Sequence, residues 1–392
     1  MNVHWIVSNY PHTYDVQAGI FYKFLAENLV KEDIDLTIIA PVPYSNKFLS
    51  LFSDKWKNYA LSPRHEEVNG VKIYRPRYLT HPNEATLGLP HYFIFKAIKK
   101  LRLPKPNLIH SFSGYPSAYA ATNYAKYLNI PIVNTFIGSD VNDYPNKSKK
   151  CFSRFMYFTD KSDKILAVSK TLSTEIKRIT GLESETLYLP VSDKIIPSIT
   201  KLDARKKLSL PEDKFIMLFA GYISEGKGVN ELIQSYRILQ EDENILGIFC
   251  GGKTNLVDEI NNLPNAKYLG QLPQEQVMNY MKAADGFILP SYSEGIGMVV
   301  VEAGMVGVPV IATAVGEISE ILSEGRGILI SPKNVEEIVT SIREVKLNYS
   351  DALKRAEMLK KYVKENFNVN KIIKKQVDIY MDVLKSFNKG AK

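Results

Sequence analysis

Cysteine is scarce in this chain, and the spacings that build metal sites are missing. The 392 residues include two cysteines, Cys151 and Cys250, and six histidines. Neither set follows a metal-ligand spacing, so the sequence predicts no metal site. So little cysteine is typical of a reducing compartment, and we expect a cytoplasmic protein.

Long apolar runs are also missing. No apolar stretch approaches the roughly 20 residues that a membrane-spanning helix needs. The N-terminal run has no basic leader and no small-residue cleavage site, so we interpret it as a first buried strand and not as a signal peptide. The sequence has no Ser-His-Asp elbow, no P-loop and no nucleic-acid-binding module, so we expect no nucleic-acid partner.

The basic charge lies entirely in the first half of the chain. Residues 1–195 carry 25 Lys and Arg against 17 Asp and Glu, whereas residues 196–392 carry 25 of each. A basic half favours an anionic partner or surface, and random surface composition is the alternative. Two stretches, Lys47–Lys57 and Phe95–Lys105, interleave cations with apolar residues. They are candidates for contact with an anionic membrane or, equally, solvated amphipathic helices.

Short apolar runs alternate with longer helical patterns, which predicts parallel α/β sheets. The pattern restarts in the second half, and the length of the chain favours two domains. The predicted strands are Val3–Val7, Leu36–Ala40, Val71–Tyr74, Leu108–His110, Ile130–Thr135, Lys164–Val168, Phe215–Ala220, Ile245–Cys250, Ala266–Leu269, Gly286–Leu289, Val308–Ala312 and Gly327–Ile330. The predicted helices include Gly19–Lys31, Ser117–Leu128, Val229–Leu239, Gln274–Ala284, Met298–Met305, Val335–Val345, Tyr349–Glu365 and Val369–Phe387.

The boundary between the domains is predicted at residues 195 and 196, within the Pro- and Ser-containing segment Pro190–Leu202. The second domain would run from 196 to 368, and the helix 369–387 could pack back on the first. Two open sheets that face each other would leave a cleft at the C-terminal ends of their strands, where ligands bind in such folds.

Two glutamates, Glu294 and Glu302, lie eight positions apart around a glycine turn. Glu294 follows the strand Gly286–Leu289, and Glu302 lies in the next apolar helix. A helix that opens on Gly295 and Gly297 offers backbone N–H groups and a positive dipole end to a phosphate. Carboxylates accept hydrogen bonds from sugar hydroxyls. The segment therefore predicts a site for a phosphorylated polyol such as a nucleotide sugar.

Other candidates also lie at strand ends. Lys227, between two glycines, could neutralise a diphosphate or be a solvated loop lysine. Gly19 could bring backbone amides to a phosphate, although entry into a helix explains it as well. Asp140 could cap a helix, and we favour a role at the cleft. His12 is the one histidine that we retain as a possible ligand contact.

Together these elements resemble the retaining glycosyltransferases of family 4, which have the GT-B fold of two Rossmann-like domains facing a central cleft. The resemblance covers nearly the whole chain. The opening segment, residues 10–43, is similar to polysaccharide-assembly members, including those of teichuronic-acid type. The matching segments are Glu294–Met298 with Glu302, Gly307–Thr313, Gly221 with Lys227 and Gly228, Ser162–Ser169 and Gly138–Asp140.

The resemblance implies roles for these residues. Glu294 would contact the transferred sugar, Glu302 would bind the ribose hydroxyls, and Lys227 would neutralise the leaving diphosphate. With Asp140, Glu294 and Lys227 form the predicted catalytic set. No metal or other cofactor is implied, so cations and helix N-termini would carry the leaving-group charge. The predicted donor-binding residues are Gly19, Gly221, Gly251, Gly295, Ile296, Gly297, Met298 and Glu302.

Three positions depart from the family pattern. Ile137 stands where many members have a histidine that faces the sugar. Tyr222 stands where many have a basic residue beside the diphosphate. Gly316 and Glu317 replace a paired glycine. Loss of the first two groups weakens charge stabilisation. It is compatible with another cation, with Arg326 and Lys253 as candidates, although the sequence itself does not show one.

We therefore expect a transferase that moves a hexosyl or N-acetylhexosaminyl group from a nucleotide sugar to a glycan or lipid-linked acceptor during cell-surface polysaccharide synthesis. It would act in the cytoplasm or peripherally at the inner face of the cell membrane. The alternatives are a GT-B epimerase or hydrolase, which would need an acid/base pair, and a catalytically weakened nucleotide-sugar-binding scaffold.

Overall fold

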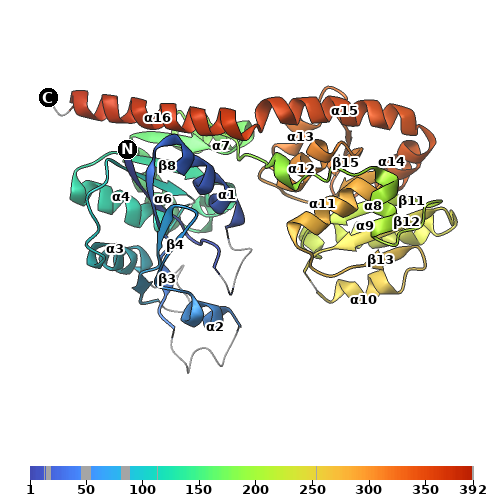
Figure 1. Cartoon of the computed structure of the whole chain (residues 1–392), viewed down its shortest axis with the longest axis horizontal. Helices are drawn as coiled ribbons and strands as arrows, with labels where there is room; N and C mark the ends of the chain where they lie inside the picture. Colours follow the sequence, from blue (N-terminus) through green and yellow to red (C-terminus); the bar gives the residue numbers. More distant parts are fainter. Residues whose placement is uncertain are drawn as a thin grey trace. The chain divides into compact units, whose positions relative to one another are not determined.

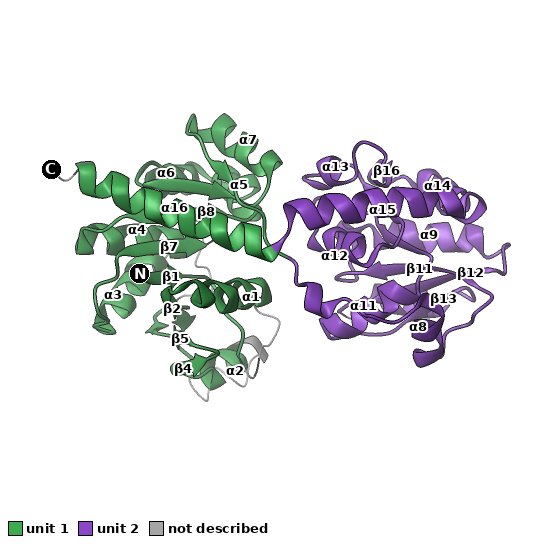
Figure 2. Cartoon of the chain, turned by 45° about the horizontal axis from the view of Figure 1, so that its top comes forward, with its two compact units in different colours: residues 1–190, 369–392 green, residues 191–368 purple. Residues whose placement is uncertain are grey.

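The computed structural model describes residues 1–12, 14, 19–45, 54–80, 89–112, 114–252 and 254–390. It divides into two compact units, which we treat separately (Figures 1 and 2). Unit 1 contains Met1–Pro190 and Val369–Lys392, and unit 2 contains Val191–Asn368. The division lies at Pro190 rather than at residue 195. Among the described residues, no helix is long and apolar enough to cross a membrane.

Unit 1 is built on an eight-stranded sheet with the order β10-β9-β8-β7-β1-β2-β5-β4. All neighbouring strands are parallel except β4 and β5, which are antiparallel. Its strands are β1 (Asn2–Ile6), β2 (Asp35–Ile39), β4 (His65–Val68), β5 (Val71–Tyr74), β7 (Leu108–Phe112), β8 (Ile132–Phe136), β9 (Lys164–Ala167) and β10 (Glu185–Thr186), and a separate pair is formed by β3 (Val42–Pro43) and β6 (Arg77–Tyr78).

Helices cover both faces of this sheet because its central strands are buried on both sides. They are α1 (Ile20–Leu29), α2 (Asp54–Leu61), α3 (Pro90–Lys100), α4 (Ser117–Leu128), α5 (Ser139–Asn142), α6 (Lys149–Asp160), α7 (Lys170–Thr180) and α16 (Val369–Gly390), with short 3-10 turns η1 (Val30–Glu32) and η3 (Pro145–Lys147).

The C-terminal helix α16 belongs to the core of unit 1. Its apolar residues Ile372, Ile379 and Val383 pack with residues of β1 and α1. The hydroxyl of Tyr380 accepts a hydrogen bond from Trp5 Nε1 at 2.9 Å. The apolar contacts and the buried hydrogen bond together fix the position of α16 on the sheet, because a buried polar group needs its partner.

Unit 2 is a six-stranded, fully parallel sheet with the order β13-β12-β11-β14-β15-β16. Its strands are β11 (Phe215–Ala220), β12 (Ile245–Cys250), β13 (Ala266–Tyr268), β14 (Gly286–Leu289), β15 (Val310–Thr313) and β16 (Ile328–Ile330). Its helices are α8 (Lys201–Lys207), α9 (Val229–Leu239), α10 (Leu256–Asn261), α11 (Gln274–Ala283), α12 (Met298–Val306), α13 (Ile318–Ile321), α14 (Val335–Leu347) and α15 (Tyr349–Asn366), with turns η4 (Asp193–Ile195) and η5 (Glu225–Lys227).

Strand order in unit 2 places two loops side by side. β11 pairs directly with β14, although β12 and β13 lie between them in the chain. The loops that follow β11 and β14 therefore leave the same edge of the sheet as neighbours, which is where parallel α/β sheets bind ligands. These loops contain Lys227 and Glu294.

Candidate functional site

The two predicted catalytic side chains of unit 2 meet. Lys227 Nζ lies 2.5 Å from Glu294 Oε1, and the side chains are 31% and 12% exposed. Ser291 Oγ donates a second hydrogen bond to the same carboxylate oxygen at 2.6 Å. The backbone also joins the two loops, since Tyr292 N donates to Gly226 O at 2.9 Å. Lysine and carboxylate are thus held together at the surface of the unit.

The loop after β15 packs against the turn Gly295–Gly297. Glu317 N donates to Gly295 O at 3.1 Å. Gly316 has a φ of 53°, and a Cβ at this position would lie 2.1 Å from Glu294 O. A side chain there would push the turn away, so Gly316 sets the position of Glu294.

Helix α12 begins directly after this turn. Gly297 forms its N-cap with a φ of 72°, and the first turn contains no acidic residue. The first N–H groups of a helix have no partner within the helix. Ile296 is buried and Met298 is the first helical residue, so the backbone of this segment can offer donors to an anion.

Glu302 lies further along α12 and reaches α11. Its Oε1 accepts a hydrogen bond from Gln274 Nε2 at 2.5 Å. Burial raises the pKa of Glu302 to about 7, and the hydrogen bond from Gln274 offsets part of that shift. The carboxyl group therefore changes charge near neutral pH.

A cavity of about 390 Å³ lies at the ends of β11 and β12, in the same unit. Gly221, Tyr222, Gly251 and Gly252 line one side, and Val277 of α11 lines another. The two predicted glycines are in close contact, because a Cβ on Gly251 would lie 1.7 Å from Gly221 O. The Tyr222 side chain, 59% exposed, forms a wall of this cavity. A cavity lined by glycine backbone and by one aromatic side chain suits the binding of a flat ring.

Neither candidate cation is found to replace the basic residue that many family members have at the position of Tyr222. Arg326 is 6% exposed, and its guanidinium donates to Ile321 O, Glu320 O and Ser323 Oγ. It caps the carbonyl end of α13, so its donors are already used within unit 2 and do not favour it as the substitute cation. Lys253 lies outside the described residues.

The remaining predicted residues belong to unit 1. Gly19 is the left-handed N-cap of α1, with a φ of 69°, which accounts for glycine at a helix entry. Asp140 lies in α5 and is 7% exposed. Its carboxylate accepts from the N–H groups of Ile137 at 3.1 Å and of Gly138 at 2.7 Å.

Asp140 thus holds its own loop, including the position of Ile137. Burial raises the pKa of Asp140 to about 6, and the backbone N–H groups lower it. Such bonding to its own loop differs from the cleft-facing role that we favoured, because the N–H groups already occupy the carboxylate. His12 lines a separate cavity of about 550 Å³ with Tyr10 and Arg75, at the ends of β1 and β2.

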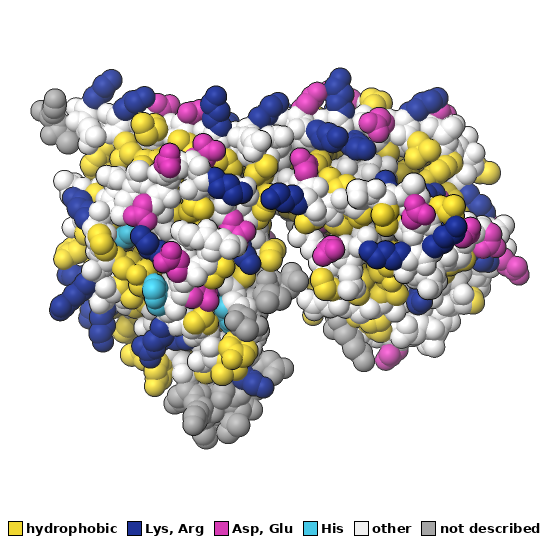
Figure 3. Space-filling view, viewed as in Figure 1, with side chains coloured by type: hydrophobic (Ala, Val, Ile, Leu, Met, Phe, Trp, Pro, Cys, Tyr) yellow, Lys and Arg dark blue, Asp and Glu magenta, His cyan; other side chains and the backbone are white. Residues whose placement is uncertain are grey.

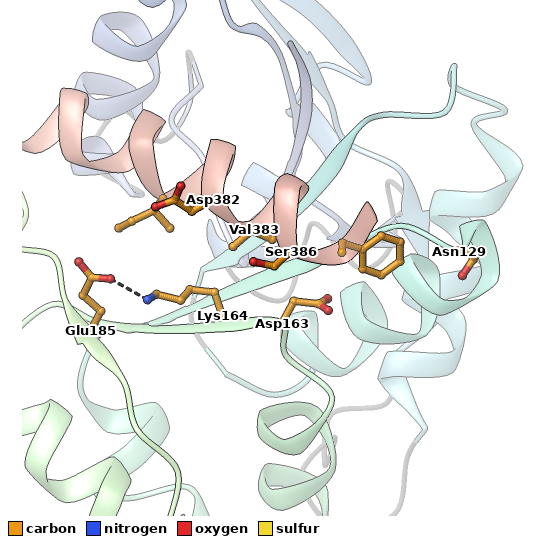
Figure 4. Close-up of a pocket in the computed structure, with 9 residues that line it drawn as sticks. Asn129, Asp163, Lys164, Glu185, Asp382, Val383 and Ser386 are labelled. Carbon is orange, nitrogen blue, oxygen red and sulfur yellow. Dashed lines mark ion pairs between the residues drawn. The ribbon is translucent and has the colours of Figure 1, made fainter. Parts of the chain in front are cut away.

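A larger cavity, of about 690 Å³, lies between α16 and the strands β9 and β10 at one end of the sheet (Figure 4). None of the predicted site residues lines it. Its charges already have partners: Lys164 pairs with Glu185 at 2.7 Å, and Asp163 accepts from Ile132 N at 2.8 Å. The cavity therefore offers an ion pair and carboxylates, and no unpaired cation among the described residues that line it would attract a diphosphate.

Sequence analysis missed two supporting groups. Ser291, which is fully buried, orients Glu294, and Gln274 contacts Glu302. Ser291 could have been noticed because it lies three positions before Glu294, whereas no local signal links Gln274 to Glu302. Among the described residues, no three His, Cys, Asp or Glu side chains could together hold a metal ion. Metal independence stays a prediction.

Comparison with known families adds two matches that cover most of the chain. Residues 18–190 match the model of Glycosyltransferase Family 4, and residues 200–366 match that of Glycosyl transferases group 1. A Bacillus subtilis (strain 168) protein named as a teichuronic acid biosynthesis glycosyltransferase, TuaC, is 32% identical over 347 residues. That match spans 87% of this chain and 88% of the relative.

Solved structures share the fold at low sequence identity. Sucrose-phosphate synthase from Thermosynechococcus elongatus has a TM-score of 0.79 at 18% identity, covering 98% of this chain and 100% of that one. Anabaena HepE, solved in complex with UDP-glucose, has a TM-score of 0.73 at 15% identity, with 98% and 100% covered. These likenesses confirm the predicted fold of two Rossmann-like domains.

Proposed function

The chain belongs to glycosyltransferase family 4, and from this premise we propose that it moves a sugar from a nucleoside-diphosphate sugar to a glycan or lipid-linked acceptor, with retained anomeric configuration, in cell-surface polysaccharide synthesis. The observation that carries the proposal is the contact between Lys227 and Glu294 beside the N-terminus of α12. It combines a cation, a hydroxyl acceptor and the N–H groups at the start of a helix along one edge of one sheet.

In this proposal each group binds one part of the donor. The base would enter the cavity lined by Gly221, Tyr222 and Gly251, and its ribose hydroxyls would donate to Glu302. Lys227 and the N–H groups of the Gly295–Gly297 turn would hold the diphosphate, and Glu294 would accept from a sugar hydroxyl. HepE, a structural neighbour, binds UDP-glucose. A uridine nucleotide is therefore the first donor to test.

In the proposed step, the acceptor hydroxyl oxygen bonds to the anomeric carbon on the face that the diphosphate leaves. The bond from that carbon to the phosphate oxygen breaks, and the acceptor proton passes to the leaving phosphate oxygen. Lys227 stabilises the negative charge that grows on the diphosphate, where a fixed cation has its largest effect. Glu294 stabilises positive charge on the sugar ring.

Contact with an anionic membrane is part of the proposal for a lipid-linked acceptor. Helix α3 buries Pro90, Ile94 and Ile98. On the opposite side Tyr92 is 43% exposed, and Lys96 Nζ lies 4.4 Å from the centre of its ring. Lys and Arg gather with apolar side chains over this part of unit 1 (Figure 3). Of the other stretch, Lys47–Lys57, residues 47–53 lie outside the described residues.

Flotation with liposomes tests the membrane part. The full chain should float with vesicles that contain anionic lipid and remain unbound with neutral ones. Replacing Tyr92 and Lys96 with serine and glutamine should reduce the floated fraction, whereas Lys267→Gln on strand β13 should not. Equal binding to both vesicle types, or none to either, would remove the membrane from the proposal.

A thermal-shift panel of nucleoside diphosphates and their sugars tests the donor site. A ligand at 100 times its dissociation constant should stabilise the fold by about 2.7 kcal/mol. Glu302→Ala should abolish the shift, and Lys267→Ala should retain it. If no nucleotide shifts the wild type, or if Glu302→Ala leaves the shift intact, the donor site is wrongly assigned. Free sugar released without acceptor would favour a hydrolase.

A further inference from the structure

Aromatic and basic side chains from several segments of unit 1 meet beyond the C-terminal end of β7. They come from the first turn of α3, the segment between β7 and α4, α4 itself, the residue before η3, and α6. None of them belongs to the donor site described above. We call this group the aromatic–cation cluster, and its members are His91, Tyr115, Tyr119, Tyr144, Lys150 and Arg154.

A hydrogen bond, ring stacking and a cation–π contact join the cluster around Tyr115. Its hydroxyl lies 2.9 Å from His91 Nδ1, and its ring stacks on that of Tyr144 with centroids 5.2 Å apart. The guanidinium carbon of Arg154 lies 4.5 Å from the centre of the Tyr115 ring. His91 also packs on Tyr119 at 4.3 Å. The side chains are therefore held by one another before any ligand arrives.

Lys150 and Arg154 lie one turn apart on the same side of α6, and both act on His91. The pKa of His91 is lowered to about 4, first by burial and then by the charges of Arg154 and Lys150. His91 is thus neutral at pH 7 and can share a proton with Tyr115 without adding charge. Arg154 is 7% exposed and Lys150 is exposed, so one cation is fixed by packing and the other can move towards a ligand.

The cluster adjoins the loop in which we placed Asp140. β7 and β8 are parallel neighbours, so the segments after them leave the same edge of the sheet. Gly114, the residue before Tyr115, packs directly on Asp140, because a Cβ on Gly114 would lie 2.8 Å from Asp140 Cβ. Ligands of parallel α/β sheets bind at this edge.

We infer that the aromatic–cation cluster binds an anionic group that the acceptor carries beside a sugar ring. A carboxylate or a phosphate would be held by Lys150 and Arg154, since both groups pair strongly with cations. Tyrosine and histidine side chains offer hydroxyl and N–H groups to ring oxygens and apolar ring edges to the sugar. The inference depends on the proposed function only in naming the ligand an acceptor.

Ligand-observed NMR titration of the full chain, without nucleotide, measures the binding directly. The probes are glucuronate, glucose 1-phosphate and glucose, which share a ring and differ in charge. We expect both anions to bind at least about tenfold more tightly than glucose, as a charged hydrogen bond implies. A preference between the two anions would identify the source of the charge as a uronic acid or a phosphate.

Two variants and a control connect the binding to the cluster. Lys150→Gln lies at an exposed site and should not affect folding. It should weaken the binding of both anions about two- to fivefold. Arg154→Gln should weaken the binding of both anions about tenfold or more, and thermal unfolding of the variant checks that it is folded. Lys100→Gln, at the far end of α3, should change neither. Glucose binding equal to that of the anions, no binding of the anions, or unchanged affinity in Lys150→Gln would overturn the inference.

The nucleotide panel separates this result from the donor proposal. A normal nucleotide shift with no anion binding would overturn the acceptor inference alone. Anion binding that depends on Lys150, without any nucleotide shift, would support the cluster and contradict the proposed function.

Discussion

Lys227 and Glu294 are 67 positions apart in the chain, yet Lys227 Nζ lies 2.5 Å from Glu294 Oε1. The contact follows from the direct pairing of β11 with β14, which places the loops after these strands side by side. A lysine held in this way is oriented before a diphosphate arrives, so little side-chain entropy is lost on binding. In the proposed function, the same carboxylate would contact the sugar attached to that diphosphate.

Lys227→Met should abolish most turnover and leave the fold intact. Removing a fixed positive group from a developing negative charge costs about 100-fold or more in kcat. The ion pair itself is partly exposed, so the free energy of unfolding should change by about 1 kcal/mol or less. Release of nucleoside diphosphate from the donor found in the nucleotide panel gives kcat. Lys267→Met on β13 is the control. Turnover within threefold of wild type would exclude the assigned role.

Nucleotide affinity should rise with pH through the titration of Glu302. Burial raises the pKa of this group to about 7, and the ionised form is the better acceptor for ribose hydroxyls. Below pH 7 binding must also remove a proton, which weakens it by up to about tenfold per pH unit. Calorimetry between pH 5.5 and 8.5 measures the trend.

Glu302→Gln separates this effect from titration of the nucleotide phosphates. The variant should show a shallower pH dependence, because only the phosphates still titrate. Identical slopes for the variant and the wild type would show that Glu302 does not contact the ribose.

Gly316→Ala should damage both stability and turnover. The new Cβ would lie 2.1 Å from Glu294 O, so the turn that holds Glu294 must move. Gly325→Ala is the matched control, since Gly325 also has a positive φ, 76°, but has no atom within 4 Å of its Cβ position. The control should lose about 1–2 kcal/mol from backbone strain alone. Chemical denaturation and kcat measure the difference; equal losses in both variants would mean that the close contact has no effect.

Tyr222→Arg should strengthen the binding of a nucleoside diphosphate. Position 222 adjoins Gly221 at the edge of the donor cavity, and an arginine there could pair with phosphate oxygens. We expect affinity to rise about two- to tenfold in Tyr222→Arg and to stay near wild type in Tyr222→Phe, which retains the aromatic wall. If the arginine weakens binding while phenylalanine does not, the tyrosine hydroxyl is dispensable and the position does not face phosphate.

Tyr380→Phe should destabilise unit 1 through α16. The Tyr380 hydroxyl contacts Trp5 Nε1 at 2.9 Å, His110 Nδ1 at 2.5 Å and Gln376 Nε2 at 2.6 Å. All four side chains are buried, so the variant leaves several polar groups without partners, at a cost of about 2–4 kcal/mol. Tyr127→Phe, at a 54% exposed position on α4, should change stability by less than about 0.5 kcal/mol. A loss below 1 kcal/mol in Tyr380→Phe would show that the network is not important for stability.

Much of the fold was predictable because its signals are local. The strands Phe215–Ala220 and Gly286–Leu289 and the helix Ser117–Leu128 were predicted with their exact bounds. β4, His65–Val68, was not predicted, because it is a polar edge strand without a continuous apolar run. Its antiparallel pairing with β5 comes from the tight turn at Asn69 and Gly70, both with positive φ.

The sequence by itself determined the two α/β halves and the family, and it predicted a donor site at Glu294 and Glu302. It could do so because the spacing of apolar residues and the glycine turns are signals that extend over only a few residues. Only the tertiary structure decided which groups meet. Lys227 reaches Glu294, Gln274 reaches Glu302, and Arg326 is committed to the end of α13. These contacts depend on strand order and on the packing of distant helices, which no local pattern encodes.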